Sequence, residues 1–139
     1  MRGKAFVGAV AVLAALGLMV STPAFAQEKV VKVGVNGPFT GPASRVGEEF
    51  KGAIAMAFEK VGNKIGDYKV EFVWVDCESD AEKGARAYEQ AITRDKIDVG
   101  FMTWHSWVSA ALMELAAKYK MPHFFSFGAG EAINAKYKS

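Results

Sequence analysis

Hydroxyl, imidazole and indole groups gather in the segment Thr103-Trp104-His105-Ser106-Trp107, where a helical apolar pattern begins. The first N–H groups of a helix lack intrahelical partners and favour an anion. Together with the hydroxyl of Thr103 or Ser106 they predict a carboxylate site, while Trp104 offers an apolar wall or a surface for a cation. Taken alone, His105 is more typical of a hydrogen-bonded surface histidine, and Trp107 of a side chain that packs inward.

A second group of candidates lies in GPFTGPASRVGEEF, residues 37–50. Two Gly-Pro pairs shape a turn before a helix, and Thr40 and Ser44 supply hydroxyls near the unpaired N–H groups of the helix start. This combination suits a carboxylate or another small anion, with Thr40 as the candidate ligand. Composition alone favours a plainer interpretation, in which Ser44 caps the helix and the glycines turn the chain.

The third candidate segment covers residues 126–130, where Ser126 supplies a hydroxyl and Gly128 and Gly130 leave backbone groups uncovered for a ligand. It lacks the third glycine of a dinucleotide-binding fingerprint, and the chain has no P-loop or C-x-x-C motif. The two histidines, His105 and His123, do not make a metal set. We therefore expect a binding surface without a cofactor or a metal.

An exported enzyme is the alternative that the chemistry leaves open. Cys77 and His105 follow neighbouring strand patterns, so a Cys–His nucleophile pair is conceivable. No pattern supplies a third group to orient the histidine or an oxyanion site, which favours binding over catalysis. Cys77 is also typical of a small, partly buried apolar residue, and a single cysteine cannot close an internal disulfide.

The elements that position these groups alternate in hydrophobic period. Strand patterns cover residues 30–35, 70–75, 98–102 and 122–126, and helical patterns follow Ser44, the capping box Ser79-Asp80-Ala81-Glu82, and Ser106. This β-α-β-α-β-α-β order predicts an α/β fold with a Rossmann-like parallel sheet. Ligands of such sheets bind beyond the carboxyl ends of the strands, which gathers residues 36–45, 76–80, 103–107 and 126–130 at one edge.

Residues 1–26 have the features of a cleaved signal peptide. A basic start with Arg2 and Lys4 precedes an uncharged apolar run, and Ala24-Phe25-Ala26 matches a signal peptidase site. The run is shorter than the ~20 residues that span a bilayer, so we expect a periplasmic protein that is not membrane-embedded after cleavage. Cleavage removes two of 17 basic residues and no acidic one, so residues 27–139 carry 15 of each. This neutral balance gives no reason to expect a nucleic-acid partner.

Four motifs, in the same order along the chain, resemble the Leu/Ile/Val-binding family of periplasmic solute-binding proteins. They are VGVNGPFTGPA starting at Val33, VDCESD starting at Val75, the glycine and hydroxyl turn of residues 100–106, and MPHFFSFGAG starting at Met121. The resemblance implies the first lobe of a type I periplasmic binding protein. In that family two α/β lobes close over an amino acid or related solute, which an ABC transporter permease then imports.

The resemblance also implies where the solute binds. By position it points to Trp104, His105 and Ser106 after the third strand and to Gly128 and Gly130 after the fourth. Trp104 stands where the family commonly shows serine, which points to another carboxylate or amide solute whose apolar part meets an indole. Since family members are much longer, residues 27–139 are expected to be an incomplete N-terminal lobe that by itself binds solute weakly or not at all.

Two further classes share this alternation of strands and helices. The ligand-binding half of a periplasmic sensor has the same fold and stays open as an alternative. A cytoplasmic receiver domain needs an acidic pair after the first strand, where this chain has Asn36-Gly37, and the signal peptide argues against the cytoplasm. The leading interpretation is a non-enzymatic binding protein for import.

Overall fold

The computed structural model describes residues 28–127, 130 and 135, so the expected signal peptide lies outside the described residues. Four predicted strands and three predicted helices are present. In chain order the elements are β1 (Lys29–Gly37), α1 (Ser44–Glu59), β2 (Lys64–Ile65), β3 (Tyr68–Asp76), α2 (Ala81–Gln90), a π-helical turn η1 (Ala91–Asp95), β4 (Val99–Phe101), α3 (Ser106–Tyr119) and β5 (His123–Phe124).

The strands form one sheet in the order β2-β3-β1-β4-β5. β1 pairs in parallel with β3 and β4, and β4 pairs in parallel with β5, which confirms the predicted α/β fold with a parallel sheet. The sheet also has an antiparallel edge, because β2 pairs with β3 in a tight hairpin through Gly66. The two residues of β2 are too few to show a period of two, so the pattern did not predict them.

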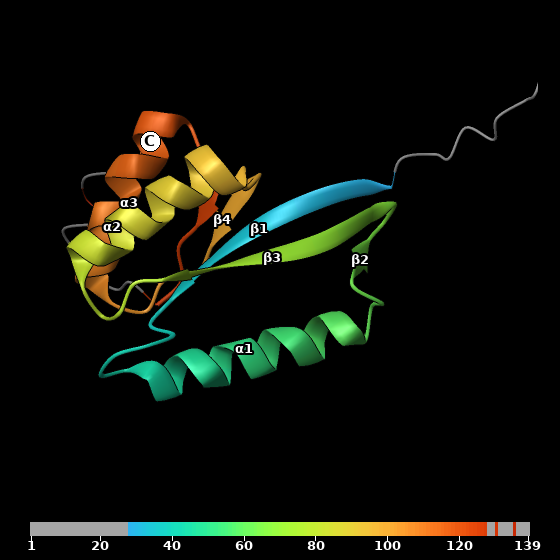
Figure 1. Ribbon diagram of the computed structural model, residues 1–139, viewed down its shortest axis with the longest axis horizontal. Coiled ribbons are helices and arrows are strands. Elements are labelled where there is room, and N and C mark those ends of the chain that lie inside the picture. The colour runs from blue at the N-terminus through green and yellow to red at the C-terminus, as the bar shows by residue number, and fades with distance from the viewer. Residues whose placement is uncertain (1–27, 128–129, 131–134, 136–139) are drawn as a thin grey trace, which may run out of the picture.

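The helices cover both faces of the sheet: α1 lies on one face, and α2 and α3 lie together on the other (Figure 1). Between α2, α3 and the sheet, one buried cluster contains Val75, Cys77, Tyr88, Ala91, Ile97, Val108, Leu112 and Ala116. Between α1 and the sheet, a smaller cluster contains Val35, Phe39 and Met102, with half-buried Phe50 and Ile54 against it. The α2 and α3 side therefore holds most of the core.

Two predicted helix caps are wrong by one residue. Ala43, without a side-chain cap, precedes α1, and Ser44 is already the first helical residue. Asp80 rather than Ser79 caps α2, since its carboxylate accepts a hydrogen bond from the Lys83 N–H at 2.8 Å. Ser79 itself has a left-handed backbone with φ of 62°, which places it in the preceding turn.

The helices of the described residues do not include one that is both long and apolar enough to cross a membrane. In the same part of the chain, no group of three or more His, Cys, Asp or Glu side chains is arranged to hold a metal ion.

Candidate functional site

The parallel strands β1, β3, β4 and β5 end at one edge of the sheet, called here the C-terminal edge. Four turns leave it: the first turn (residues 38–43), the second turn (77–80), the third turn (102–105) and the fourth turn (from Phe125). In Figure 1 this edge lies where β1 and β3 run toward the starts of the helices. The structure thus gathers the predicted segments, although Gly128 lies outside the described residues.

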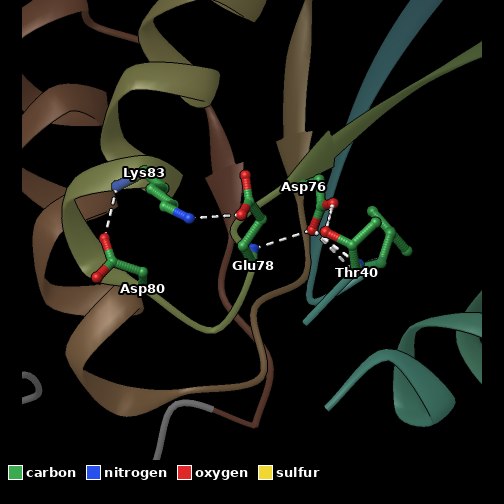
Figure 2. A network of polar contacts seen from close by, with 6 residues as sticks. Thr40, Asp76, Glu78, Asp80 and Lys83 are labelled. Carbon is green, nitrogen blue, oxygen red and sulfur yellow. Dashed lines mark hydrogen bonds and ion pairs between the residues drawn. The ribbon is translucent and has the colours of Figure 1, made fainter. Parts of the chain in front are cut away.

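Asp76, at the end of β3, ties the first turn to the second (Figure 2). One carboxylate oxygen accepts hydrogen bonds from the N–H groups of Phe39 at 2.9 Å, Thr40 at 3.2 Å and Glu78 at 2.9 Å. The other accepts the Thr40 hydroxyl at 2.6 Å. Burial by itself raises the pKa of Asp76, but these donors outweigh it and hold the pKa below its ordinary value. The candidate ligand Thr40 is therefore committed as a donor to Asp76.

The glycines of the first turn serve close backbone contacts. Gly41 has φ of 81°, and a Cβ there would lie 2.9 Å from the Glu78 carbonyl oxygen of the second turn. Gly47, the fourth residue of α1, lets that helix pack closely on the Pro38 carbonyl. A Cβ at Gly47 would lie 2.4 Å from the Pro38 carbonyl oxygen. The GPFTGPASRVG segment therefore packs the first turn onto its neighbours, in addition to turning the chain.

A chain of hydroxyls joins the third turn to the fourth. Ser109 Oγ lies 2.6 Å from Thr103 Oγ1, which lies 3.2 Å from the Ser126 carbonyl oxygen. A carbonyl only accepts, so Thr103 donates its one proton to Ser126 and accepts from Ser109, whose Oγ also lies 3.1 Å from the His105 carbonyl oxygen. Thr103 is 1% exposed and Ser109 is 0% exposed, so the Thr103 side chain lies beneath the edge. Ser109, one turn into α3, was not predicted because its partners appear only in the fold.

The start of α3 has no side-chain cap. His105 occupies the cap position, but its side chain makes no capping hydrogen bond, and Ser106 begins the helix half-buried. The His105 ring stacks on Trp107 with centroids 4.3 Å apart, and burial lowers its pKa, which favours the neutral ring. Its Nε2 is buried and lacks a hydrogen-bond partner within the described residues.

Trp107 links the start of α3 to the second turn instead of packing inward. It is 57% exposed, and its indole N–H donates to the Ser79 carbonyl oxygen at 3.3 Å. The prediction of an inward-packed Trp107 is therefore wrong. The preceding strands position the second and third turns side by side, which the local helical period could not show.

Three rings form an aromatic cluster at the same edge: Phe50 from α1, Trp104 from the third turn and Phe127 from the fourth. Each pair of ring centroids lies 5.7 Å apart. Trp104 is 37% exposed and Phe127 is 60% exposed, so the cluster presents apolar surface to solvent. Trp104 was a predicted site residue, whereas Phe50 and Phe127 were read as a helix stripe and a turn. Their nearness to the predicted segments was the available signal.

Cys77 does not fit the role of an enzymatic nucleophile. Its side chain is 3% exposed in the core cluster, next to Gly84. Burial raises the pKa of the thiol, and the charges of Asp76 and Asp80 raise it further. Because the thiolate is the reactive form, this environment disfavours the Cys77–His105 alternative, and the burial of Cys77 agrees with a small apolar role.

The sequence matches known proteins along most of its length. Residues 30–137 match a family model described as periplasmic binding protein. A curated relative, "Leu/Ile/Val-binding protein homolog 6" of Brucella abortus (strain 2308), is 44% identical over 64 residues, which are 46% of this chain and 16% of that protein.

Solved structures share the fold. A solute-binding protein of an ABC transporter from R. palustris, in complex with 4-hydroxybenzoate, has a TM-score of 0.71 at 28% identity over 78% of this chain and 30% of that one. The leucine-binding protein LivK from Thermotoga maritima MSB8 has a TM-score of 0.64 at 28% identity over 68% and 27%. The aligned regions thus span under a third of these relatives. The motifs, the sheet order and these matches agree that the chain belongs to the periplasmic binding protein family.

Proposed function

We propose that residues 27–139 form part of the N-terminal lobe of a periplasmic substrate-binding component of an ABC transporter. Residues 1–26 would direct export and be removed, and a permease would receive the solute. Family membership supports a periplasmic, non-enzymatic role in transport, and the buried Cys77 argues against a thiol enzyme. A periplasmic sensor would use the same edge, and loss of solute uptake on deletion of the gene would distinguish transport from sensing.

We infer that the solute is a small carboxylate. His105 at the cap position of α3 makes no side-chain hydrogen bond to the first N–H groups of that helix. These groups therefore favour an anion. The predicted ligand residues His105 and Ser106 lie at this helix start, and Thr40 and Ser126 lie in the adjoining turns. Gly128 and Gly130 remain predicted contacts of the fourth turn.

The aromatic cluster is the observation that carries the choice of solute. Trp104 and Phe127 are exposed beside the open start of α3, so an apolar ring can stack there while its carboxylate meets the helix. The R. palustris protein was solved with 4-hydroxybenzoate, a molecule of this kind. We therefore propose an aromatic carboxylate in preference to a branched-chain amino acid.

The charges at the edge favour the same choice. An amino acid carries an ammonium group that needs an acceptor, but the carboxylates of the second turn already have donors: Asp76 accepts four hydrogen bonds, Glu78 pairs with Lys83 at 2.6 Å and Asp80 caps α2. A simple carboxylate has no ammonium to satisfy. Binding by this lobe would therefore depend on one charged group of the solute.

An NMR titration of the ¹⁵N-labelled chain tests the proposal. Addition of 4-hydroxybenzoate should shift the amide signals of residues 103–108 and the Trp104 indole signal, with a dissociation constant of about 1 mM, because one lobe supplies only part of the contacts. The uncharged analogue 4-hydroxybenzamide is the matched control and should bind less. Equal responses to both, or a stronger response to isoleucine, would contradict an aromatic carboxylate.

The variant Trp104→Leu separates stacking from anion binding. It should weaken the response to 4-hydroxybenzoate while leaving a response to acetate at the start of α3, because leucine removes the ring but not the helix N–H groups. Trp74→Phe, which lies on the α1 face of the sheet against Phe39, is the control and should bind as the parent does.

A further inference from the structure

His123 lies in β5 beneath the third turn and bridges two elements. Its Nδ1 lies 2.7 Å from the Tyr88 hydroxyl of α2, and its Nε2 lies 3.2 Å from the Met102 carbonyl oxygen. Tyr88 is 0% exposed, and the His123 ring also stacks on Phe125 with centroids 3.9 Å apart. The predicted site did not include His123 or Tyr88.

The partners decide which nitrogen carries the proton. The Met102 carbonyl can only accept, so Nε2 of His123 is the donor and Nδ1 is left to accept the Tyr88 hydroxyl proton. Both hydrogen bonds are then made by a neutral ring. Burial lowers the pKa of His123 to about 4, which agrees with this state. Burial also raises the pKa of Tyr88, so its hydroxyl keeps the proton that it donates.

The residue that His123 holds is where β4 leaves the sheet. Met102 has φ of 71°, a left-handed conformation that is strained for a residue other than glycine. β5 supports it on both sides, because the Met102 N–H donates to the Phe124 carbonyl at 3.0 Å and the Met102 carbonyl accepts from His123. The conformation of Met102 sets the direction in which Thr103 and Trp104 leave the strand.

Gly100 makes room for this arrangement. A Cβ at Gly100 would lie 2.1 Å from Nδ1 of His123 and 2.6 Å from the Tyr88 hydroxyl oxygen. No side chain larger than glycine fits between strand β4 and the pair. The sequence of β4 thus accommodates the His123–Tyr88 hydrogen bond directly beneath the third turn.

We propose that His123 is a positioning residue for the solute site: its neutral ring, oriented by Tyr88, holds Met102 and so fixes the third turn that presents Trp104 and the open start of α3. This inference rests on the proposed function of that turn. The groups that face the ring are Tyr88 from α2, Gly100 from β4, Met102 from the third turn and the stacked ring of Phe125. Lys120, which follows α3, is the charged residue in the described lining of a shallow pocket that His123 also lines.

Three variants of the whole chain test the proposal by NMR. His123→Gln keeps a donor that can reach Met102, whereas His123→Phe keeps a ring without one, and Tyr88→Phe removes only the hydroxyl. We expect His123→Phe to shift the amides of residues 102–106 and weaken 4-hydroxybenzoate binding about tenfold, because a buried carbonyl loses its donor. His123→Gln should restore binding to within about threefold of the parent, the rescue that a role in packing alone would not show.

The histidine ring itself gives a reading that needs no solute. In the parent, ring ¹⁵N shifts should show a proton on Nε2 and none on Nδ1 at pH 7, and Tyr88→Phe should raise the pKa of His123 because the neutral ring loses a donor. A proton on Nδ1, or amide changes confined to β5 with residues 102–106 unmoved in Tyr88→Phe and His123→Phe, would overturn the proposal. If 4-hydroxybenzoate does not shift the signals of the parent, the proposed solute is wrong. The ring and amide signals of the variants still test the role of His123.

Discussion

The two halves of the C-terminal edge are held together by different chemistry. The first and second turns meet at Asp76, an ionised and half-buried carboxylate with four donors. The third turn is held by neutral groups: the buried Thr103 hydroxyl joins it to the fourth turn, and the His123 ring, hydrogen-bonded to Tyr88, binds the Met102 carbonyl. A charge is tolerated where solvent and N–H groups surround it, but neutral groups are required beneath the edge, where a charge would lack solvation.

The difference has a consequence for the solute site. The half that carries Trp104 and the start of α3 is supported by groups without formal charge, so its geometry should be insensitive to salt. The half that contains Thr40 depends on an ionised carboxylate. Breaking one half at a time therefore shows which of them the site needs.

The largest effect is expected from Gly100→Ala, which breaks the neutral half. The new methyl group would overlap the His123 ring and the Tyr88 hydroxyl, so we expect a loss of about 4 kcal/mol in the free energy of unfolding. Urea unfolding followed by circular dichroism measures it. Gly52→Ala is the matched control, since a Cβ there meets nothing within 4 Å and should stabilise α1 by up to about 1 kcal/mol. Equal stability of the two variants would refute the close packing.

The two halves should also lose stability in different pH ranges. The pKa of His123 is about 4 in the folded chain and about 6.5 when unfolded, so the unfolded state binds the extra proton between these values. The part of the free energy of unfolding that comes from keeping His123 neutral is fully present above pH 6.5. It falls by about 3 kcal/mol as the pH drops toward 4. The lowered pKa of Asp76 instead contributes stability that is present above its ordinary value near 3.8 and is lost only below it.

Urea unfolding from pH 7.5 to 4.5 checks the first range, with His123→Gln as the control. The free energy of unfolding of the variant should fall much less over this range than that of the parent. The lowered pKa of His105 contributes equally to both proteins. If the parent and His123→Gln decline in parallel across this range, His123 is not the group responsible.

A smaller effect is expected from Asp76→Asn, which breaks the charged half. The amide nitrogen cannot accept from the donors that the carboxylate satisfied, so we expect a loss of about 2 kcal/mol in unfolding free energy. Thr40→Val should cost less and Thr40→Ser almost nothing, because serine keeps the hydroxyl. Unfolding at pH 7 orders the three variants, and a Thr40→Ser as damaging as Asp76→Asn would contradict the role of the hydroxyl.

The smallest effect is expected from Ser109→Ala. Thr103 still donates to Ser126, so only the single hydroxyl proton of Ser109, shared between Thr103 and the His105 carbonyl, is lost, at a cost of about 1 kcal/mol. Thr103→Val should cost more because it leaves the Ser126 carbonyl without its donor, while the Ser109 hydroxyl can still donate to the His105 carbonyl. Their order in urea unfolding tests the direction of the hydroxyl chain, and the reverse order would mean that the protons run the other way.

Much of the fold could be predicted because its signals are local. The runs in β1 and β3 and the stripe of α3 have clear periods, and the order of elements implies a parallel sheet with ligands at one edge. Ala53, Ala57 and Val61 recur at helical spacing after Ser44, which predicts one apolar helix face, but the structure leaves all three exposed and ends α1 at Glu59. A period indicates which residues share a face, whereas burial depends on what covers it.

The sequence by itself determined the α/β class, the family and the segments that meet at the C-terminal edge. Only the tertiary structure decided which side chains there are available to a solute: Thr103 is buried, Thr40 is committed to Asp76, and Phe50 joins Trp104. The physical reason is separation along the chain. Thr40 and Asp76 are 36 residues apart and Tyr88 and His123 are 35 apart, so no local pattern encodes their contacts. They form only when parallel strands bring distant turns together.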